Sequence, residues 1–133
     1  MRFSHARRGA AAVEFALTIA PFLILLFGII NCALAAYAYG FIAYSAQQAA
    51  RFAAVHGSLS SSPVSADEIV RFVDARAAGL KRDHLSVFTN WNPNNRPGGA
   101  VTVQVEYRFF FAIPFAPLPP ITLTATAART VLD

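Results

Sequence analysis

The feature that most constrains this 133-residue chain is a run without charged side chains that extends from Phe15 to Ala50. Ala, Leu, Ile and Phe dominate the run, and about 20 apolar residues are enough to cross the hydrocarbon core of a bilayer. Its densest part, residues 15–34, reaches that length. The whole chain is 56% hydrophobic and only 14% charged, which excludes a disordered protein. The run therefore predicts a transmembrane helix.

Positive charge is concentrated before this run. Arg2, Arg7 and Arg8 lie within the first nine residues, and the rest of the chain has eight basic side chains against seven acidic ones. Because basic residues stay on the cytoplasmic side of a membrane, we expect a single-pass protein of the inner (cytoplasmic) membrane. Its amino terminus would be cytoplasmic, and its carboxyl-terminal part periplasmic or extracellular. The remaining basic residues are scattered among carboxylates, which argues against nucleic acid as a partner.

The apolar run is too long for an ordinary cleaved secretory signal. Such a signal has an apolar region of about 7 to 15 residues, so we expect this helix to remain attached to the protein. A helix from Val13 to Val55 would be about 63 Å long, against a hydrocarbon core of about 30 Å. About half of it should therefore project from the membrane, where Phe41, Phe52 and Val55 offer apolar surface.

Glu14 is the lone ionisable residue at the head of the run. A carboxylate costs on the order of 2 to 3 kcal/mol at the centre of a membrane span and less near its end. Glu14 therefore has either a partner or a place in the headgroup layer, and the sequence leaves both open. Pro21, Gly28 and Asn31 soften the helix, or are simply tolerated by lipid and by neighbouring helices.

The residues around Glu14 resemble the beginning of a known family. The sequence RRGAAAVEFAL at residues 7–17, followed by the apolar run, is similar to the start of TadE-like proteins, the pseudopilins of tight-adherence (Flp-type) pilus systems. It also follows the type IV prepilin plan of a short basic leader that ends in glycine, here Gly9. Glu14 and Phe15 are the fifth and sixth residues after that glycine. The resemblance is close across roughly residues 7–31.

The resemblance implies that a membrane-embedded prepilin peptidase cleaves between Gly9 and Ala10, and that Arg7 and Arg8 hold this bond at the cytoplasmic surface. Glu14 would then pair with the new α-amine of a neighbouring subunit and set the register between helices. Major Flp pilins are shorter and almost entirely helical, so the domain that follows implies a minor pilin. Its partners would be membrane lipid, the prepilin peptidase, other pilin or pseudopilin subunits and the inner-membrane assembly platform.

After the leader (1–9) and the long helix (10–56), residues 57–133 are expected to form a small exported domain. The sequence from Ser65 to Glu68 reads as a capping box, and apolar residues at helical spacing predict a short helix that ends near Gly79. Alternation of apolar and polar residues then predicts strands, at residues 85–91, 101–109 and 121–127. The expected fold class is α+β: a long amino-terminal transmembrane helix, a short helix and a three-stranded antiparallel sheet.

The link between the last two predicted strands, residues 110–120, is unusual because it is apolar and contains four prolines. We interpret it as a candidate interaction loop built on Phe110, Phe111, Phe115 and Leu118. Because loops are mostly exposed, an apolar one is either covered by the long helix or offered to another protein.

The sequence gives little support for an enzyme. His5, His56 and His84 lie in the leader, at a helix end and before a strand, and Cys32 is the single cysteine. No catalytic or metal-binding motif connects these residues, so we expect no cofactor, no metal and no small-molecule substrate. A membrane-anchored enzyme is the least favoured hypothesis. The alternative to a minor pilin is a signal-anchored periplasmic binding or adaptor module that is not processed.

Overall fold

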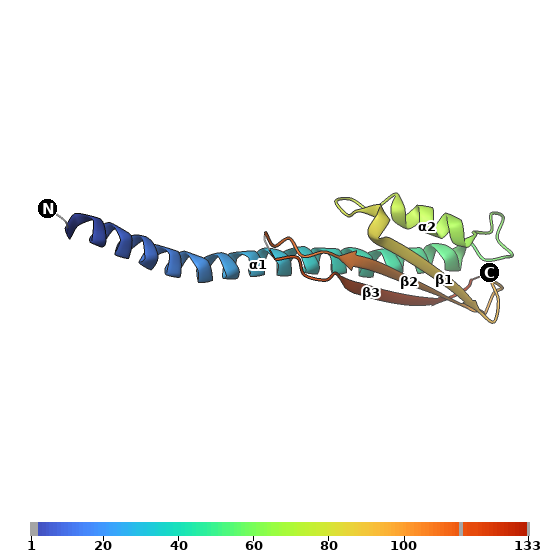
Figure 1. Cartoon of the computed structure of the whole chain (residues 1–133). Coiled ribbons are helices and arrows are strands. Elements are labelled where there is room, and N and C mark those ends of the chain that lie inside the picture. The colour runs from blue at the N-terminus through green and yellow to red at the C-terminus, as the bar shows by residue number, and fades with distance from the viewer. Residues whose placement is uncertain (1–2, 115, 133) are drawn as a thin grey trace.

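The computed structural model describes residues 3–114 and 116–132, and it has the expected α+β architecture. A long helix is followed by a short one, a 3₁₀ turn and three strands. The elements are α1 (Phe3–Val55), α2 (Ala66–Asp74), η1 (Arg82–His84), β1 (Leu85–Asn92), β2 (Ala100–Phe109) and β3 (Ile121–Thr130). Figure 1 shows α1 as a rod whose carboxyl-terminal half is packed with α2 and the sheet, while its amino-terminal half extends beyond them.

Helix α1 is longer than predicted at its amino end. It begins at Phe3 rather than at Ala10, and it continues through Pro21. The added residues 3–9 include Ala6, Arg7 and Arg8, and Ala and Arg are among the best helix formers. The basic segment before the apolar run is therefore part of the same helix.

The carboxyl-terminal half of α1 packs through small residues. Its buried positions recur every three or four residues, as one face of a helix requires, and most of them are alanine: Asn31, Ala38, Ile42, Ser45, Ala46, Ala49, Ala50, Ala53 and Ala54. Val55, one of the residues expected to offer apolar surface, is 48% exposed. Phe41 and Phe52 are half-buried beside the alanine face. The short alanine side chains allow the sheet to approach the helix closely.

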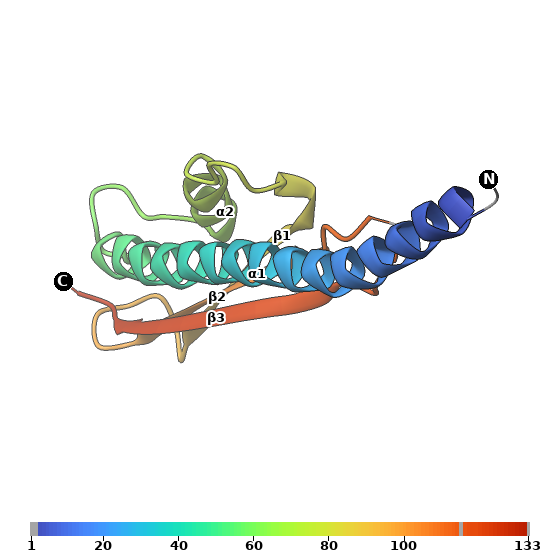
Figure 2. The ribbon, with the colours of Figure 1, turned by 90° about the vertical axis from the view of Figure 1, so that its left-hand side faces the viewer.

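The sheet has the order β1-β2-β3, and both pairings are antiparallel. Strand β2 is central, and its inward residues are buried: Val101, Val103, Val105, Tyr107 and Phe109. Figure 2 shows α2 and β3 on opposite sides of α1. The last strand extends three residues beyond the predicted 121–127, because its register pairs Thr130 with Ala100 at the start of β2.

Helix α2 starts as predicted but ends earlier. The capping box is present: the Ser65 backbone N–H donates to Glu68 Oε2 at 2.8 Å, and the Glu68 N–H donates to Ser65 Oγ at 3.3 Å. The predicted end near Gly79 was wrong, because the helix ends at Asp74. The chain tightens into turns after this residue and reverses at Gly79, where φ is +77°. Leu80 still packs against the core, which explains why apolar spacing continued past the helix.

Candidate functional site

The amino-terminal half of α1 presents a bare apolar surface. Among the described residues, the structure has one helix long and apolar enough to cross a membrane, and the most apolar stretch of this helix contains no buried residue. Leu17 and Ile24 are 72% and 75% exposed. Leaving one such side chain in water rather than burying it forgoes about 1.5 to 3 kcal/mol. The surface therefore suits lipid or other helices, as in a single-pass membrane anchor.

The residues of the prepilin-like motif lie at the start of this bare surface. Gly9, Ala10, Glu14 and Phe15 are all exposed and follow one another on α1. The backbone carbonyl of Glu14 accepts a hydrogen bond from the hydroxyl of Thr18 at 3.0 Å, one turn further along the helix. Gly9 is inside the helix rather than in an extended segment. Arg7 and Arg8 belong to the first turns of the same helix.

Asn31 marks the boundary between the bare half of α1 and the half that is packed in the domain. It is only 5% exposed, and its side-chain amide bonds to the backbone of the apolar loop. Its Oδ1 accepts from the Ala112 N–H at 2.7 Å, and its Nδ2 donates to the carbonyls of Phe27 at 2.8 Å and Ala112 at 3.4 Å. The amide thus fastens the loop to the helix.

This role of Asn31 was not predicted from the sequence. A signal was present, because a buried amide costs several kcal/mol unless it is hydrogen-bonded, and a lone amide in an apolar run therefore requires a partner. The partner could not be identified from the sequence, because Asn31 bonds to backbone atoms of Ala112, which is 81 residues away.

The candidate interaction loop is both fastened to the helix and exposed. Phe111 is half-buried and meets the ring of Phe109 edge-on, with the centroids 5.5 Å apart. Phe110 and Leu118 are 46% and 49% exposed. Phe115, also named from the sequence, lies outside the described residues. Part of the loop is therefore covered and part of it is exposed, and its role as an interaction loop stays a prediction.

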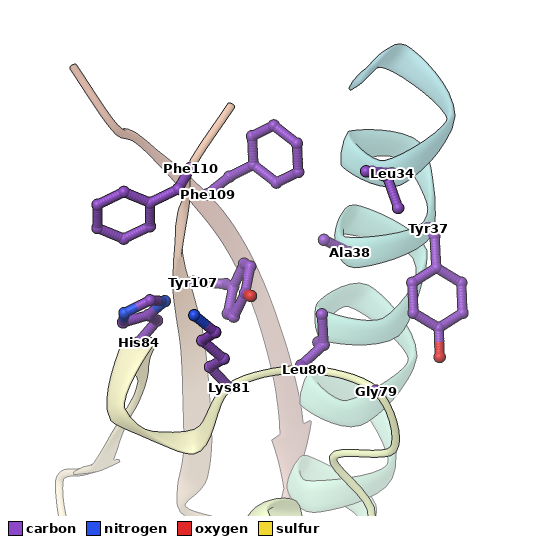
Figure 3. Close-up of a pocket in the computed structure, with 10 residues that line it drawn as sticks. All are labelled: Leu34, Tyr37, Ala38, Gly79, Leu80, Lys81, His84, Tyr107, Phe109 and Phe110. Carbon is purple, nitrogen blue, oxygen red and sulfur yellow. The ribbon is translucent and has the colours of Figure 1, made fainter. Parts of the chain in front are cut away.

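A pocket of about 600 Å³ lies behind the loop, between α1 and the end of β2 (Figure 3). Its walls are mainly apolar and aromatic, with Lys81 and His84 as the ionisable side chains other than tyrosine: Leu34, Tyr37, Ala38, Gly79, Leu80, Lys81, His84, Tyr107, Phe109 and Phe110. The Tyr37 hydroxyl donates to the Ala78 carbonyl at 2.9 Å. No carboxylate lines the pocket, and within residues 3–114 and 116–132 no three His, Cys, Asp or Glu side chains are grouped to hold a metal ion.

The match to a known family falls on the helix that carries the bare surface. Residues 9–51 match the family model of TadE-like proteins. The amino-terminal helix is TadE-like. This confirms the resemblance inferred from the prepilin-like motif, and it points to a pilin-type family whose members are generally structural proteins rather than enzymes.

The matched region begins and ends within α1. It begins at Gly9 and ends at Arg51, so it includes both the bare half of the TadE-like helix and most of its alanine face. It stops before α2 and the sheet. Neither a curated protein nor a solved structure gives a significant match to the chain. The similarity to TadE-like proteins is thus confined to the helix.

Proposed function

We propose that the protein is a minor pilin-like subunit of a Tad (Flp-type) pilus assembly system. The bare half of its TadE-like helix would anchor it in the inner membrane and pack against the helices of other pilin or pseudopilin subunits. The observation that carries the proposal is the order of features on one helix: Arg7 and Arg8, then Gly9, then Glu14, then an apolar surface that no residue within 3–114 and 116–132 covers.

The amino terminus would be cytoplasmic and the domain of α2 and the sheet would lie in the periplasm or outside the cell. The charges favour this orientation, because Arg7 and Arg8 precede the span and basic side chains are retained on the cytoplasmic side. The inner-membrane assembly platform would then meet the protein through its first turns and its membrane-embedded surface.

A prepilin peptidase would cleave between Gly9 and Ala10. Both residues are helical in the structure, so the peptide must unwind locally to enter an active site. Glycine makes this easier, because it is about 1 kcal/mol less favourable than alanine inside a helix. The cleavage would leave an α-amine on Ala10, at the end of an apolar helix.

Glu14 and Phe15 would act in assembly, with Glu14 pairing with the α-amine of a neighbouring subunit. The side chain is exposed at the head of the bare surface. Once packed among apolar helices, an unpaired carboxylate would be costly, and losing one partner of a buried ion pair costs about 3 to 5 kcal/mol. The pair would therefore select one register between helices.

Mass spectrometry of the membrane-extracted protein tests the processing. In cells that contain the peptidase, the chain should begin at Ala10, and a chain that retains Met1 would contradict the proposal. Replacing Glu14→Ala should leave the protein resistant to carbonate extraction but reduce its incorporation into pili or its capture of pilin partners. Thr18→Ala, one turn away, is the matched control. Normal piliation with Glu14→Ala would place Glu14 in the headgroup layer without a partner.

One observation favours the alternative of an unprocessed, signal-anchored adaptor module. Phe110 and Leu118 are exposed on a loop at the edge of the domain, where they offer apolar surface to a partner protein. In that case the helix serves only as a tether. The adaptor would retain Met1 and would function with an unrelated transmembrane helix in place of its own.

A further inference from the structure

We propose that the β2–β3 loop, of which the structure describes residues 110–114 and 116–120, lies in the headgroup layer of the membrane from which α1 emerges, and that it fixes how far the helix is inserted. This inference rests on the membrane anchoring proposed above. It assigns a lipid surface, rather than another protein, as the partner of the exposed apolar loop.

The position of the loop is the first argument. Of the parts of the domain, the β2–β3 loop lies nearest to the bare half of α1 in both views (Figures 1 and 2). It is held there by the bonds between Asn31 and Ala112. Residues 10–30 rise about 31 Å at 1.5 Å per residue, which equals the thickness of the hydrocarbon core. A span made of the bare half therefore ends where the loop is fastened.

The composition of the loop is the second argument. From Phe109 to Ala128 the chain has no charged residue, and the side chains of Phe110, Leu118 and Ile121 are 46%, 49% and 41% exposed. Aromatic rings are enriched at membrane–water interfaces. The four prolines have no N–H group, which lowers the number of backbone donors that must be satisfied in a partly dehydrated layer.

The charges around the loop are the third argument. Lys81, Arg82 and Arg108 lie at this end of the domain, where the carboxylates are Asp83 and, two residues before Arg108 on β2, Glu106. Arg108 meets the loop at Phe110, whose ring lies 5.9 Å from its guanidinium carbon and 4.5 Å from the ring of His84. Basic side chains beside an apolar surface suit anionic phospholipid headgroups. The loop would thus insert its apolar side chains while the cations contact phosphates.

This placement has a consequence for the membrane span. The span becomes residues 10–30, whereas composition favoured residues 15–34. Cys32, which is exposed beside Asn31, then lies at the outer interface. Glu14 lies about 6 Å from Ala10 along the helix axis, inside the cytoplasmic edge of the hydrocarbon core. At the depth set by the loop, the Glu14 carboxylate therefore needs a partner more than it would in the headgroup layer.

The test uses the full chain with Cys32→Ala, reconstituted in vesicles of phosphatidylcholine and phosphatidylglycerol. A new cysteine at Leu118→Cys carries an environment-sensitive NBD label. Ser61→Cys, exposed in the link at the opposite end of the domain, is the matched control, and Ile24→Cys reports the centre of the span. The label at position 118 should shift to shorter wavelength and be quenched by headgroup spin labels. The label at 61 should remain as in water, and that at 24 should respond to spin labels deep in the acyl chains.

Three outcomes would overturn the proposal. If the label at Leu118→Cys is as exposed to water as that at Ser61→Cys while the label at Ile24→Cys is deep, the protein is anchored but its loop is not in the membrane. If shielding at 118 appears only at a high ratio of protein to lipid, the loop contacts other copies of the protein. If carbonate releases the chain from the vesicles, the anchoring itself is refuted, and the loop proposal with it.

Discussion

Asn31 links the sequence of the helix to the placement of a loop 81 residues away. Its amide accepts the N–H of Ala112 and donates to two carbonyls. Each of these bonds contributes about 0.5 to 1.5 kcal/mol, and leaving a buried donor or acceptor unsatisfied costs about 1 to 3 kcal/mol. The Asn31 side chain therefore helps to hold the β2–β3 loop against α1.

We expect Asn31→Ala to lower the free energy of unfolding by about 1 to 3 kcal/mol, because it removes the two hydrogen bonds between the buried Asn31 side chain and the backbone of Ala112, each worth about 0.5 to 1.5 kcal/mol. Thermal or denaturant unfolding of the purified protein in detergent measures this change. Cys32→Ala is the control, since Cys32 is adjacent but exposed. Equal stability of the two variants would show that water replaces the amide at no cost.

Glu68 gives α2 a dependence on pH. The Ser65 backbone N–H, followed by the Ser65 hydroxyl, holds the pKa of Glu68 below its ordinary value of 4.5. Because folding lowers this pKa, the ionised carboxylate stabilises the fold above pH 4.5, and the contribution is lost as the pH falls through the lowered value.

Unfolding curves recorded from neutral to acidic pH should therefore show a difference in the free energy of unfolding between the native chain and Glu68→Gln. This difference should become smaller as the pH falls below 4.5. The amide of Gln can still accept a hydrogen bond but carries no charge, so Glu68→Gln isolates the ionised form. If the difference in the free energy of unfolding stays constant with pH, the stabilisation by the capping box does not depend on this charge.

At the scale of elements, the sequence predicted which helices and strands exist better than how they pack. The uncharged run, the capping box at Ser65 and the alternation in β2 were sufficient for α1, the start of α2 and the sheet. The core face of α1 was not evident, because alanine is compatible with buried and exposed positions alike and the bulky Val55 turned out to be exposed. The end of α2 and the length of β3 depend on turns and register that involve distant residues.

Larger side chains on the alanine face of α1 should destabilise the domain. Ala50 is fully buried, whereas Gln47 on the same part of the helix is exposed. Added methylene groups in a packed core typically cost about 1 to 3 kcal/mol, so Ala50→Leu should reduce the stability of the domain by that amount. Gln47→Leu should change it by less than about 0.5 kcal/mol. The difference between their thermal unfolding midpoints is the measurement, and equal midpoints would mean that the helix and sheet are loosely packed.

The molecule as a whole is divided at Asn31. Beyond it, α1 is the centre of a domain, while before it the same helix is bare and apolar. The TadE-like match crosses this division, since it covers residues 9–51. The amino end of the candidate site was named from the sequence alone, because Arg7, Arg8, Gly9 and Glu14 lie within one stretch of eight residues. The loop that meets the helix at Asn31 was predictable as an apolar segment but not in its position, because that position depends on two hydrogen bonds between the Asn31 side chain and the backbone of Ala112.

This division predicts that the two halves of α1 can be exchanged independently. Replacing residues 15–30 with an unrelated apolar helix should leave the thermal unfolding of the domain unchanged, because almost all these side chains are exposed. Membrane anchoring should persist, and cleavage should still occur because Gly9 and Glu14 are retained. Incorporation into pili should be lost, since helix packing in a membrane depends on particular side chains rather than on hydrophobicity.

The replaced segment must end at Ile30, so that only the bare half of α1 is changed. Extending it to Leu34 removes Asn31 and one wall of the pocket, so the longer replacement should also destabilise the domain. The pair of replacements separates the two roles of α1, with unfolding and piliation measured on both. Full piliation with residues 15–30 replaced would mean that the helix is only a tether, and the adaptor module would then be the better account of this protein.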